Sequence, residues 1–435
     1  MKSGVDEAVA NISSYSISYL KIANSSIDSI VTNEEDTGSL FVSKGKRVFS
    51  VNIDKVTPEG ISRAVSVAKK NLHDILPKED YYGIADGPFN YAKSTEADSK
   101  LWNYDNATIA DMAYEVINSA LAAGAKSVAG TVVISKSRNA FATSKKASGE
   151  ERNASIKVSV RAFGKTASTQ NVMTAKRLNG MHAGRLAKRT AELANIQSSI
   201  GRIKNGKYDI VYMQQPAGLL MSMVNEMACM GNVETGSFLT GKLGTKISDG
   251  RLTMYDDGKS NWLIDSSPFD DEGFPTKKTR LIEDGKLLTY LHNNSTATKY
   301  NVESTGNAGL VMPNPNTSVI EHKNTVPFDK MISRLDKGIL VTNSWYTRFS
   351  NYLSGDFSTV PRDLAVYVEH GEPKFAIRQL DVSSATGIRI SDNMMRMLKN
   401  VECAADDSIQ TGSWDAEDYF VTPSILVKDV KVTTA

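Results

Sequence analysis

Along the start of the chain, the spacing of apolar and polar residues changes from one segment to the next, and each spacing predicts a different element. The opening segment, residues 5–22, is mixed, and we interpret it as a helix. Residues 39–53 place strand-forming side chains on both sides of Gly45, which predicts a hairpin. A second helix should begin after Thr57, because this residue suits a helix cap and Pro58 suits the first helical position.

The next stretch combines two more helices with alternating strands. Apolar residues at helical spacing predict helices at 108–123 and 182–196. Strands are expected at 128–135 and at 156–162, where apolar and polar residues alternate. The order hairpin, helix, helix, meander, helix indicates an α+β arrangement rather than a regular βαβ winding.

The pattern changes at Lys207, and we divide the chain there. Residues 1–206 are predicted to form an N-terminal α/β domain, and residues 207–435 a larger, mainly β domain. A long apolar helix is predicted from Pro216 to Met230. The other elements predicted in the second domain are a strand at 210–213, hairpins at 280–291 and 364–377, a helix at 394–401 and a strand at 425–432. The predicted fold class is therefore α+β.

Composition and charge narrow the class of protein. The 435 residues include 51 basic and 49 acidic side chains, and this balance gives no reason to expect a nucleic-acid or membrane-surface partner. The most basic stretch, 176–189, has the spacing of a solvated helix face, with a phosphate-binding patch as the alternative. The two cysteines, Cys229 and Cys403, form no CxxC pair, which excludes a cysteine-rich metal cluster. Without a secretory leader or a long apolar run, we expect a cytoplasmic protein with no membrane partner.

Common catalytic motifs are missing from the sequence. None of the five histidines has another histidine three to five residues away, so no HExxH zinc helix is expected, and we interpret His73 and His370 as ordinary surface histidines. Residues 354–358 resemble a phosphate loop but open no helix. The acidic run 270–273 lacks the ligand spacing of a calcium loop and is predicted to be a solvated turn, and 256–258 is also predicted to be a turn.

The most informative segment is 224–234, with the sequence VNEMACMGNVE. On its residues alone, it is the end of a core helix that stops near Gly231 and leaves a carboxylate on its wet side.

This segment also resembles the metal-binding helix of the TldD/PmbA family, whose catalytic branch carries HExxxH. Asn225 stands at the position of the first histidine, Glu226 at the glutamate and Met230 at the second histidine. Gly231 matches the flanking pattern, whereas Glu234 falls one position late for the family's final glutamate.

Further motifs of this family follow in the family's order, and the resemblance extends from about residue 39 to the C-terminus. The matching segments are 236–244 (SFLxxKLG), 266–276 (SPxDDEGxPT), 304–308 (STGNA), 354–358 (the TGDFS motif of the PmbA branch) and 423–432 (the closing strand). With both histidines replaced, the chain resembles the PmbA/TldE-like, non-catalytic branch.

The resemblance implies a chain without a metal site. In the catalytic branch, zinc is held by the two histidines and a C-terminal cysteine, and the glutamate is the general base. An amide and a thioether are poor zinc ligands, so Asn225 and Met230 are poor replacements. Cys403 lies in the right region but does not fit the catalytic cysteine cleanly, which leaves its role open. We therefore expect no catalytic residue, metal or cofactor in this chain.

By the same resemblance, a TldD-like catalytic subunit is the expected partner, and it would supply the zinc. The pair would be a peptidase that acts on unfolded peptides or modified-peptide precursors, with this chain lining the substrate cleft. Two alternatives remain open. One is a stand-alone homodimeric protein that binds peptides without cutting them, and the other is a metal-independent hydrolase, for which no Ser–His–acid set can be assembled.

The spacing of the degenerate motif also bears on local structure. Residues five apart lie about 140° apart around an ideal helix. The HExxxH spacing therefore requires a bulge or a helix end if both side chains are to converge. Gly231 is a candidate for such an irregularity here.

Overall fold

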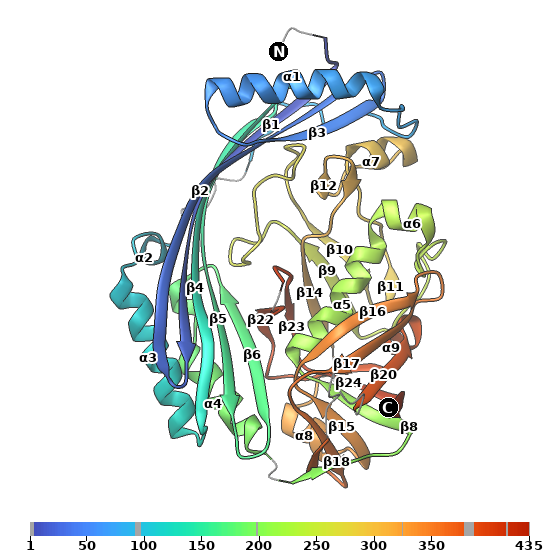
Figure 1. Ribbon diagram of the computed structural model, residues 1–435. Helices are drawn as coiled ribbons and strands as arrows, with labels where there is room; N and C mark the ends of the chain where they lie inside the picture. Colours follow the sequence, from blue (N-terminus) through green and yellow to red (C-terminus); the bar gives the residue numbers. More distant parts are fainter. Residues whose placement is uncertain are drawn as a thin grey trace.

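The N-terminal part of the protein is built on one long, curved antiparallel sheet. The computed structural model describes residues 4–91, 97–196, 199–323, 325–377, 387–414 and 416–434. The sheet has the strand order β3-β2-β1-β4-β5-β6 (Figure 1). Its strands are β1 (Glu7–Ala23), β2 (Ser26–Lys44), β3 (Arg47–Ile53), β4 (Ser127–Thr143), β5 (Ser148–Phe163) and β6 (Ser168–Ala175).

The helix predicted for residues 5–22 is wrong, because this segment forms the central strand β1. It pairs with β2 on one side and with β4 on the other over almost its whole length. Leu20 and Ile22 are buried, while Tyr19 and Lys21 are exposed, which is the period-two pattern of a strand. Pairing on both edges fixes the segment as a strand, and a mixed local pattern gives little sign of such distant partners.

Helices cover the convex face of this sheet at its two ends (Figure 1). Helix α1 (Pro58–Asp74) packs over Ala8 and Leu40, whereas α3 (Asn106–Ala122) and α4 (Ala183–Ala194) pack over the end that carries Leu20. Two short helices, α2 (Ser99–Trp102) and η1 (Leu178–Gly180), complete this layer. The concave face is turned toward the C-terminal part of the chain (Figure 1).

The C-terminal part contains two further sheets. The smaller has the order β11-β10-β9-β14-β23-β22, and the larger runs β16-β17-β20-β24-β8-β15-β18-β19-β7, with β21 on β24. The strands of the smaller sheet are β9 (Leu252–Asp257), β10 (Lys278–Glu283), β11 (Lys286–Leu287), β14 (Thr317–His322), β22 (Ile409–Gly412) and β23 (Tyr419–Thr422). Those of the larger are β7 (Ile200–Gly201), β8 (Gly206–Tyr212), β15 (Lys337–Val341), β16 (Ser344–Asn351), β17 (Asp356–Pro361), β18 (Ala365–Glu369), β19 (Glu372–Ile377), β20 (Ile388–Asn393), β21 (Val401–Cys403) and β24 (Ile425–Thr434).

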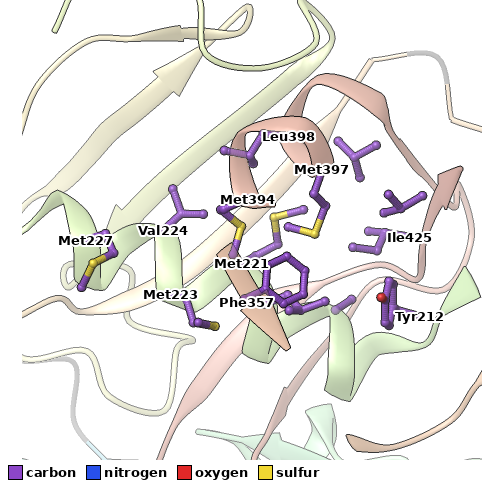
Figure 2. Close-up of a cluster of buried hydrophobic side chains, with 14 of the residues drawn as sticks. Tyr212, Met221, Met223, Val224, Met227, Phe357, Met394, Met397, Leu398 and Ile425 are labelled. Atoms are coloured by element: carbon purple, nitrogen blue, oxygen red, sulfur yellow. The ribbon is translucent and has the colours of Figure 1, made fainter. Parts of the chain in front are cut away.

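One central helix, α5 (Gln214–Ala228), joins these sheets into a single core. Its buried methionines Met221 and Met227 belong to the same apolar cluster as Met394 and Met397 of α9 (Met394–Asn400) and Phe357 of β17 (Figure 2). The remaining elements are α6 (Met230–Gly236), α7 (Asn294–Tyr300), α8 (Phe328–Ser333), β12 (Ala308–Gly309) and β13 (Met312–Pro313).

The predicted α+β class is confirmed, with strands dominating the larger C-terminal part. The cap at Thr57 is also confirmed, since its hydroxyl accepts a hydrogen bond from the Gly60 amide at 3.2 Å. The hairpins predicted within 39–53, 280–291 and 364–377 form, and they turn at Gly45, Gly285 and Gly371. Within the described ranges, no helix is long and apolar enough to cross a membrane.

Candidate functional site

The degenerate motif lies across a break between two helices. The predicted continuous helix to Met230 is wrong, because α5 ends at Ala228 and α6 begins at Met230. Cys229 between them has extended backbone angles (φ −61°, ψ 129°). The amide of Met230 donates to the Leu291 carbonyl and the Leu291 amide donates to the Ala228 carbonyl, each at 2.9 Å. The irregularity that the spacing requires is thus present, at Cys229 rather than at Gly231.

Asn225 is held in a buried polar network near the end of α5. Its side chain is 1% exposed. The amide nitrogen Nδ2 donates to Oδ1 of Asp256 at 3.3 Å and to the Tyr255 carbonyl at 3.5 Å. The amide oxygen accepts from the Ser318 hydroxyl at 3.5 Å. Both ends of the amide are therefore used by hydrogen bonds within the chain.

Asp256 is the centre of this network. Its carboxylate accepts from the side-chain amide of Asn307 at 2.7 Å, and from the main chain and side chain of Asn316 at 2.7 and 2.9 Å. Burial raises the pKa of Asp256 to about 6, although the amides of Asn307, Asn316 and Asn225 favour the charged form. The turn predicted at 256–258 is therefore displaced, because Asp256 and Asp257 are fully buried at the end of β9 and the chain turns only after them.

The other two motif positions have contrasting environments. Glu226 is exposed on the surface of α5, as the sequence predicted. Neighbouring protein atoms nevertheless partly desolvate its carboxylate and raise its pKa, and the charge of Asp418 adds to this effect. Met230 is buried in the apolar core of the C-terminal part. The Met230 thioether and the Glu226 carboxylate therefore lie in surroundings that differ from the polar network around the Asn225 amide.

Both cysteines lie in surroundings that disfavour a thiolate. Cys229 sits at the helix break and Cys403 in β21, and both thiols are free and buried. Burial raises the pKa of Cys403 to about 12 and that of Cys229 well above its ordinary value. Both are therefore protonated at neutral pH, whereas zinc binds the thiolate.

The donor groups of the motif do not fit a zinc ion. Zinc in proteins is held by thiolates, imidazoles and carboxylates. Here Asn225 uses both ends of its amide internally, and Met230 offers a buried thioether. In the part of the chain that the structure describes, no three His, Cys, Asp or Glu side chains are placed to hold one metal ion.

A cleft of about 410 Å³ lies between the concave sheet and the C-terminal part. Asn11 and Ser13 of β1 and Asn139 of β4 line one wall. The opposite wall comes from the family-like motifs and the loop that follows them, namely residues 267, 269–271, 306–308 and 314–316. Asn307 and Asn316 line this cleft and also hold Asp256, so the cleft wall and the degenerate motif belong to one hydrogen-bonded unit.

The prediction that 270–273 is a solvated turn is wrong for two of its carboxylates. Asp270 is 9% exposed and accepts from the main-chain amides of Glu272, Phe274 and Ala308 at 2.9–3.1 Å. Burial raises the pKa of Asp270 to about 7. Glu272 is fully buried, and burial raises its pKa well above the ordinary value. Asp270 thus ties the SPxDDEG-like turn to the STGNA-like loop, whereas Glu272 accepts from the Asn294 amide at 3.2 Å.

Contacts between the two parts of the chain hold the cleft together. The Lys176 ammonium donates to the carbonyl and hydroxyl of Ser266 at 2.7 and 2.8 Å. Lys157 donates to the Ala416 carbonyl at 3.1 Å, and Arg161 pairs with Asp363. Sequence reasoning did not identify Asp256, Asn307 or Asn316 as site residues. Its only available signal was the asparagine within the STGNA-like segment.

Comparisons with known proteins agree on one family. Residues 205–434 match the family model described as the PmbA/TldA metallopeptidase C-terminal domain. A metalloprotease PmbA homolog of Buchnera aphidicola is 26% identical over 249 residues, 57% of this chain and 51% of that protein. The metalloprotease PmbA of Escherichia coli O157:H7 is 26% identical over 218 residues, 49% of this chain and 45% of that protein. The matched stretch is thus about half the length of these relatives.

The fold is shared over the whole chain with a solved structure. The crystal structure of TldE from Thermococcus kodakarensis superimposes with a TM-score of 0.83 at 21% sequence identity. The superposition covers 99% of this chain and 98% of that one.

Proposed function

Because the chain belongs to the PmbA/TldD family of metallopeptidases, we propose that it is the metal-free, TldE-like subunit of a two-chain peptidase. A TldD-like partner supplies the zinc site, and this chain lines the cleft in which an unfolded peptide is held. The complex works in the cytoplasm, where the two buried cysteines stay reduced.

The observation that carries the proposal is the state of Asn225. Its side-chain amide donates to Asp256 and accepts from Ser318. Replacing Asn225 would therefore remove one hydrogen-bond donor from the buried carboxylate of Asp256. A position that binds metal needs an electron pair free to face the ion. This position instead contributes to holding Asp256, and through it Asn307 and Asn316 of the cleft wall.

The cleft supports the peptide-holding part of the proposal. Its lining is rich in asparagine and serine side chains, which offer both donors and acceptors. Groups of this kind can bond to the main chain of a peptide whatever its side chains are. A cleft without a deep apolar pocket therefore suits substrates of many sequences.

The test is co-expression with a candidate partner that has an intact HExxxH helix. We expect a stable complex on size-exclusion chromatography, about one zinc per pair, and peptidase activity. Replacing the glutamate of the partner's HExxxH by glutamine should abolish cleavage, since a general base contributes roughly 10²–10⁴ in rate. A chain that elutes as a homodimer and never binds the partner, yet binds peptides, would instead support a stand-alone peptide-binding protein.

A further inference from the structure

A second and larger cavity opens where α4 meets the C-terminal part. Its volume is about 890 Å³, and its lining includes residues from β6, α4, α8 and the loop before β22. The basic segment 176–189, interpreted from the sequence as a solvated helix face, forms one wall. The exposed side chains of this segment line the cavity rather than an open surface.

The basic wall is formed by regularly spaced side chains. His182, Arg185 and Arg189 follow one another at intervals of three and four residues, so they lie on one face of α4. Lys188 pairs with Glu192 at 3.9 Å. For Arg185, no carboxylate within ion-pair distance is found among the described residues. Arg189 lies over the Phe328 ring, 5.2 Å from its centre.

The wall opposite α4 is acidic, but two of its carboxylates are already used. Asp406 accepts the Phe328 amide at 2.9 Å, and Asp407 accepts the Ser424 amide at 3.0 Å. Apolar side chains also line the cavity, namely Met173, Leu186, Met213, Trp262, Phe328 and Ile409. The cavity is therefore amphiphilic. Its lining contains guanidinium groups from α4, carboxylates from the C-terminal part and apolar side chains.

From this arrangement we infer that the cavity binds an extended peptide segment in which acidic and apolar side chains alternate. Arginine recognises carboxylates through paired hydrogen bonds, and Arg185 is available for this. The apolar lining takes the apolar side chains, and the volume lies within the range of ordinary ligand sites. A nucleic acid fits less well, because it carries a phosphate at every nucleotide beside Asp329, Asp406 and Asp407, whereas an alternating peptide carries its carboxylates on one side only and can turn them toward Arg185.

The cavity is separate from the cleft lined by Asn307 and Asn316, and its residues are not those of the degenerate motif. Lys176 lies between the two, since it lines the cavity while its ammonium binds Ser266 next to the cleft. A peptide held here is one that the chain binds on its own, without a zinc-containing partner. The inference therefore does not rest on the proposed function.

The test uses the purified full-length chain and a fluorescent hexapeptide of alternating leucine and glutamate, with both ends blocked. Fluorescence anisotropy should report binding of this peptide, and the same peptide with glutamine in place of glutamate should bind at least tenfold more weakly. Arg185→Glu/Arg189→Glu should weaken binding of the acidic peptide at least tenfold. The matched control is Lys69→Glu/Lys70→Glu on α1, which makes the same charge change at exposed helix positions and should alter affinity less than twofold.

The single variant Arg185→Glu serves as a check on folding, since this exposed side chain supports no internal contact among those described. Equal binding of the glutamate and glutamine peptides would overturn the inference. So would unchanged affinity in both arginine variants, or no measurable binding at millimolar peptide. Tighter binding of a single-stranded DNA oligomer of equal charge, lost in the same variants, would show that the cavity serves phosphates instead.

Discussion

Asn225 and Asp256 form a buried, hydrogen-bonded pair of side chains at the degenerate motif. A neutral amide is compatible with a carboxylate whose pKa is raised to about 6, because the amide donates to the charged form and adds no charge of its own. The folded pKa lies above the ordinary value of 3.8. The folded state therefore holds its proton more tightly, and the contribution of Asp256 to stability falls as pH rises from about 4 to about 6.

Asn225→Asp should make the protein strongly pH-sensitive. Two adjacent buried carboxylates cannot both ionise easily, so both folded pKa values would lie above their unfolded values, and stability would be lost as pH rises through them. We expect a loss of about 3–5 kcal/mol in the free energy of unfolding at pH 8, and a clearly smaller loss at pH 5. Asn225→Ala is the control, with a loss of about 1–3 kcal/mol because Asp256 loses one of its buried donors. Urea unfolding at both pH values measures this, and an equal loss at pH 5 and pH 8 for Asn225→Asp would contradict it.

Glu226 stands at the position of the family's catalytic glutamate, but Asn225 and Met230 replace the two histidines on either side of it. We expect Glu226→Gln to change the peptidase activity of the assembled complex by less than about threefold, because Asn225 and Met230 are poor zinc ligands and would not hold a metal to activate a water beside it. The measurement is the ratio kcat/KM for a model peptide, with size-exclusion chromatography to verify assembly. A hundredfold loss in an intact complex would assign chemistry to this carboxylate.

At the scale of elements, the sequence was most informative where local chemistry decides the structure. Thr57 with Pro58, and the turns at Gly285 and Gly371, gave correct boundaries because a cap or a tight turn depends on neighbouring residues. The strand β1 was missed because its local pattern is mixed and one of its two partners, β4, is far away in the chain, where Val9 pairs with Thr143. The break at Cys229 was anticipated from spacing but not located, since it depends on hydrogen bonds to Leu291.

The same distinction explains which parts of the site were missed. Family-like motifs identify the position of Asn225, but the local sequence predicts a turn at its partner Asp256. It also predicts solvated side chains at Asp270 and Glu272, because acidic residues before a glycine usually mark a surface turn. Their burial results from long-range packing of one loop on another, which local sequence does not encode.

Helix α5 should tolerate little added volume on the side that faces the smaller sheet. A methyl group on Gly218 would come within 1.8 Å of the Phe420 ring, which is fully buried in β23. Gly218→Ala should therefore cost about 1–3 kcal/mol of stability, even though alanine is the better helix former. The control is Ser222→Ala on the partly exposed side, where we expect a change within about 0.5 kcal/mol. Equal stability of the two variants in urea would show that the Phe420 ring can move aside.

At the scale of the whole molecule, the concave side of the long curved sheet faces the C-terminal part (Figure 1). Both parts contribute residues to the cleft. Neither part forms the cleft alone, since Ser13 and Asn139 come from the sheet and Asn307 and Asn316 from the other side. The ion pair Arg161–Asp363 and the Lys176–Ser266 contact cross the same junction. Substrate binding here would therefore depend on the relative placement of both parts.

This arrangement predicts that a peptide substrate of the complex passes beside Ser13. Both native cysteines are buried, so a cysteine introduced at Ser13 can be labelled selectively with a benzophenone maleimide. In the assembled complex, illumination should crosslink an unfolded substrate peptide to the Ser13→Cys chain. The control is Ser62→Cys on α1, an exposed position outside the cleft, which should give at most a tenth of that yield. Excess unlabelled peptide should suppress the crosslink, since both compete for one site. Equal yields at the two positions, or crosslinks confined to the partner chain, would mean that this cleft does not hold the substrate.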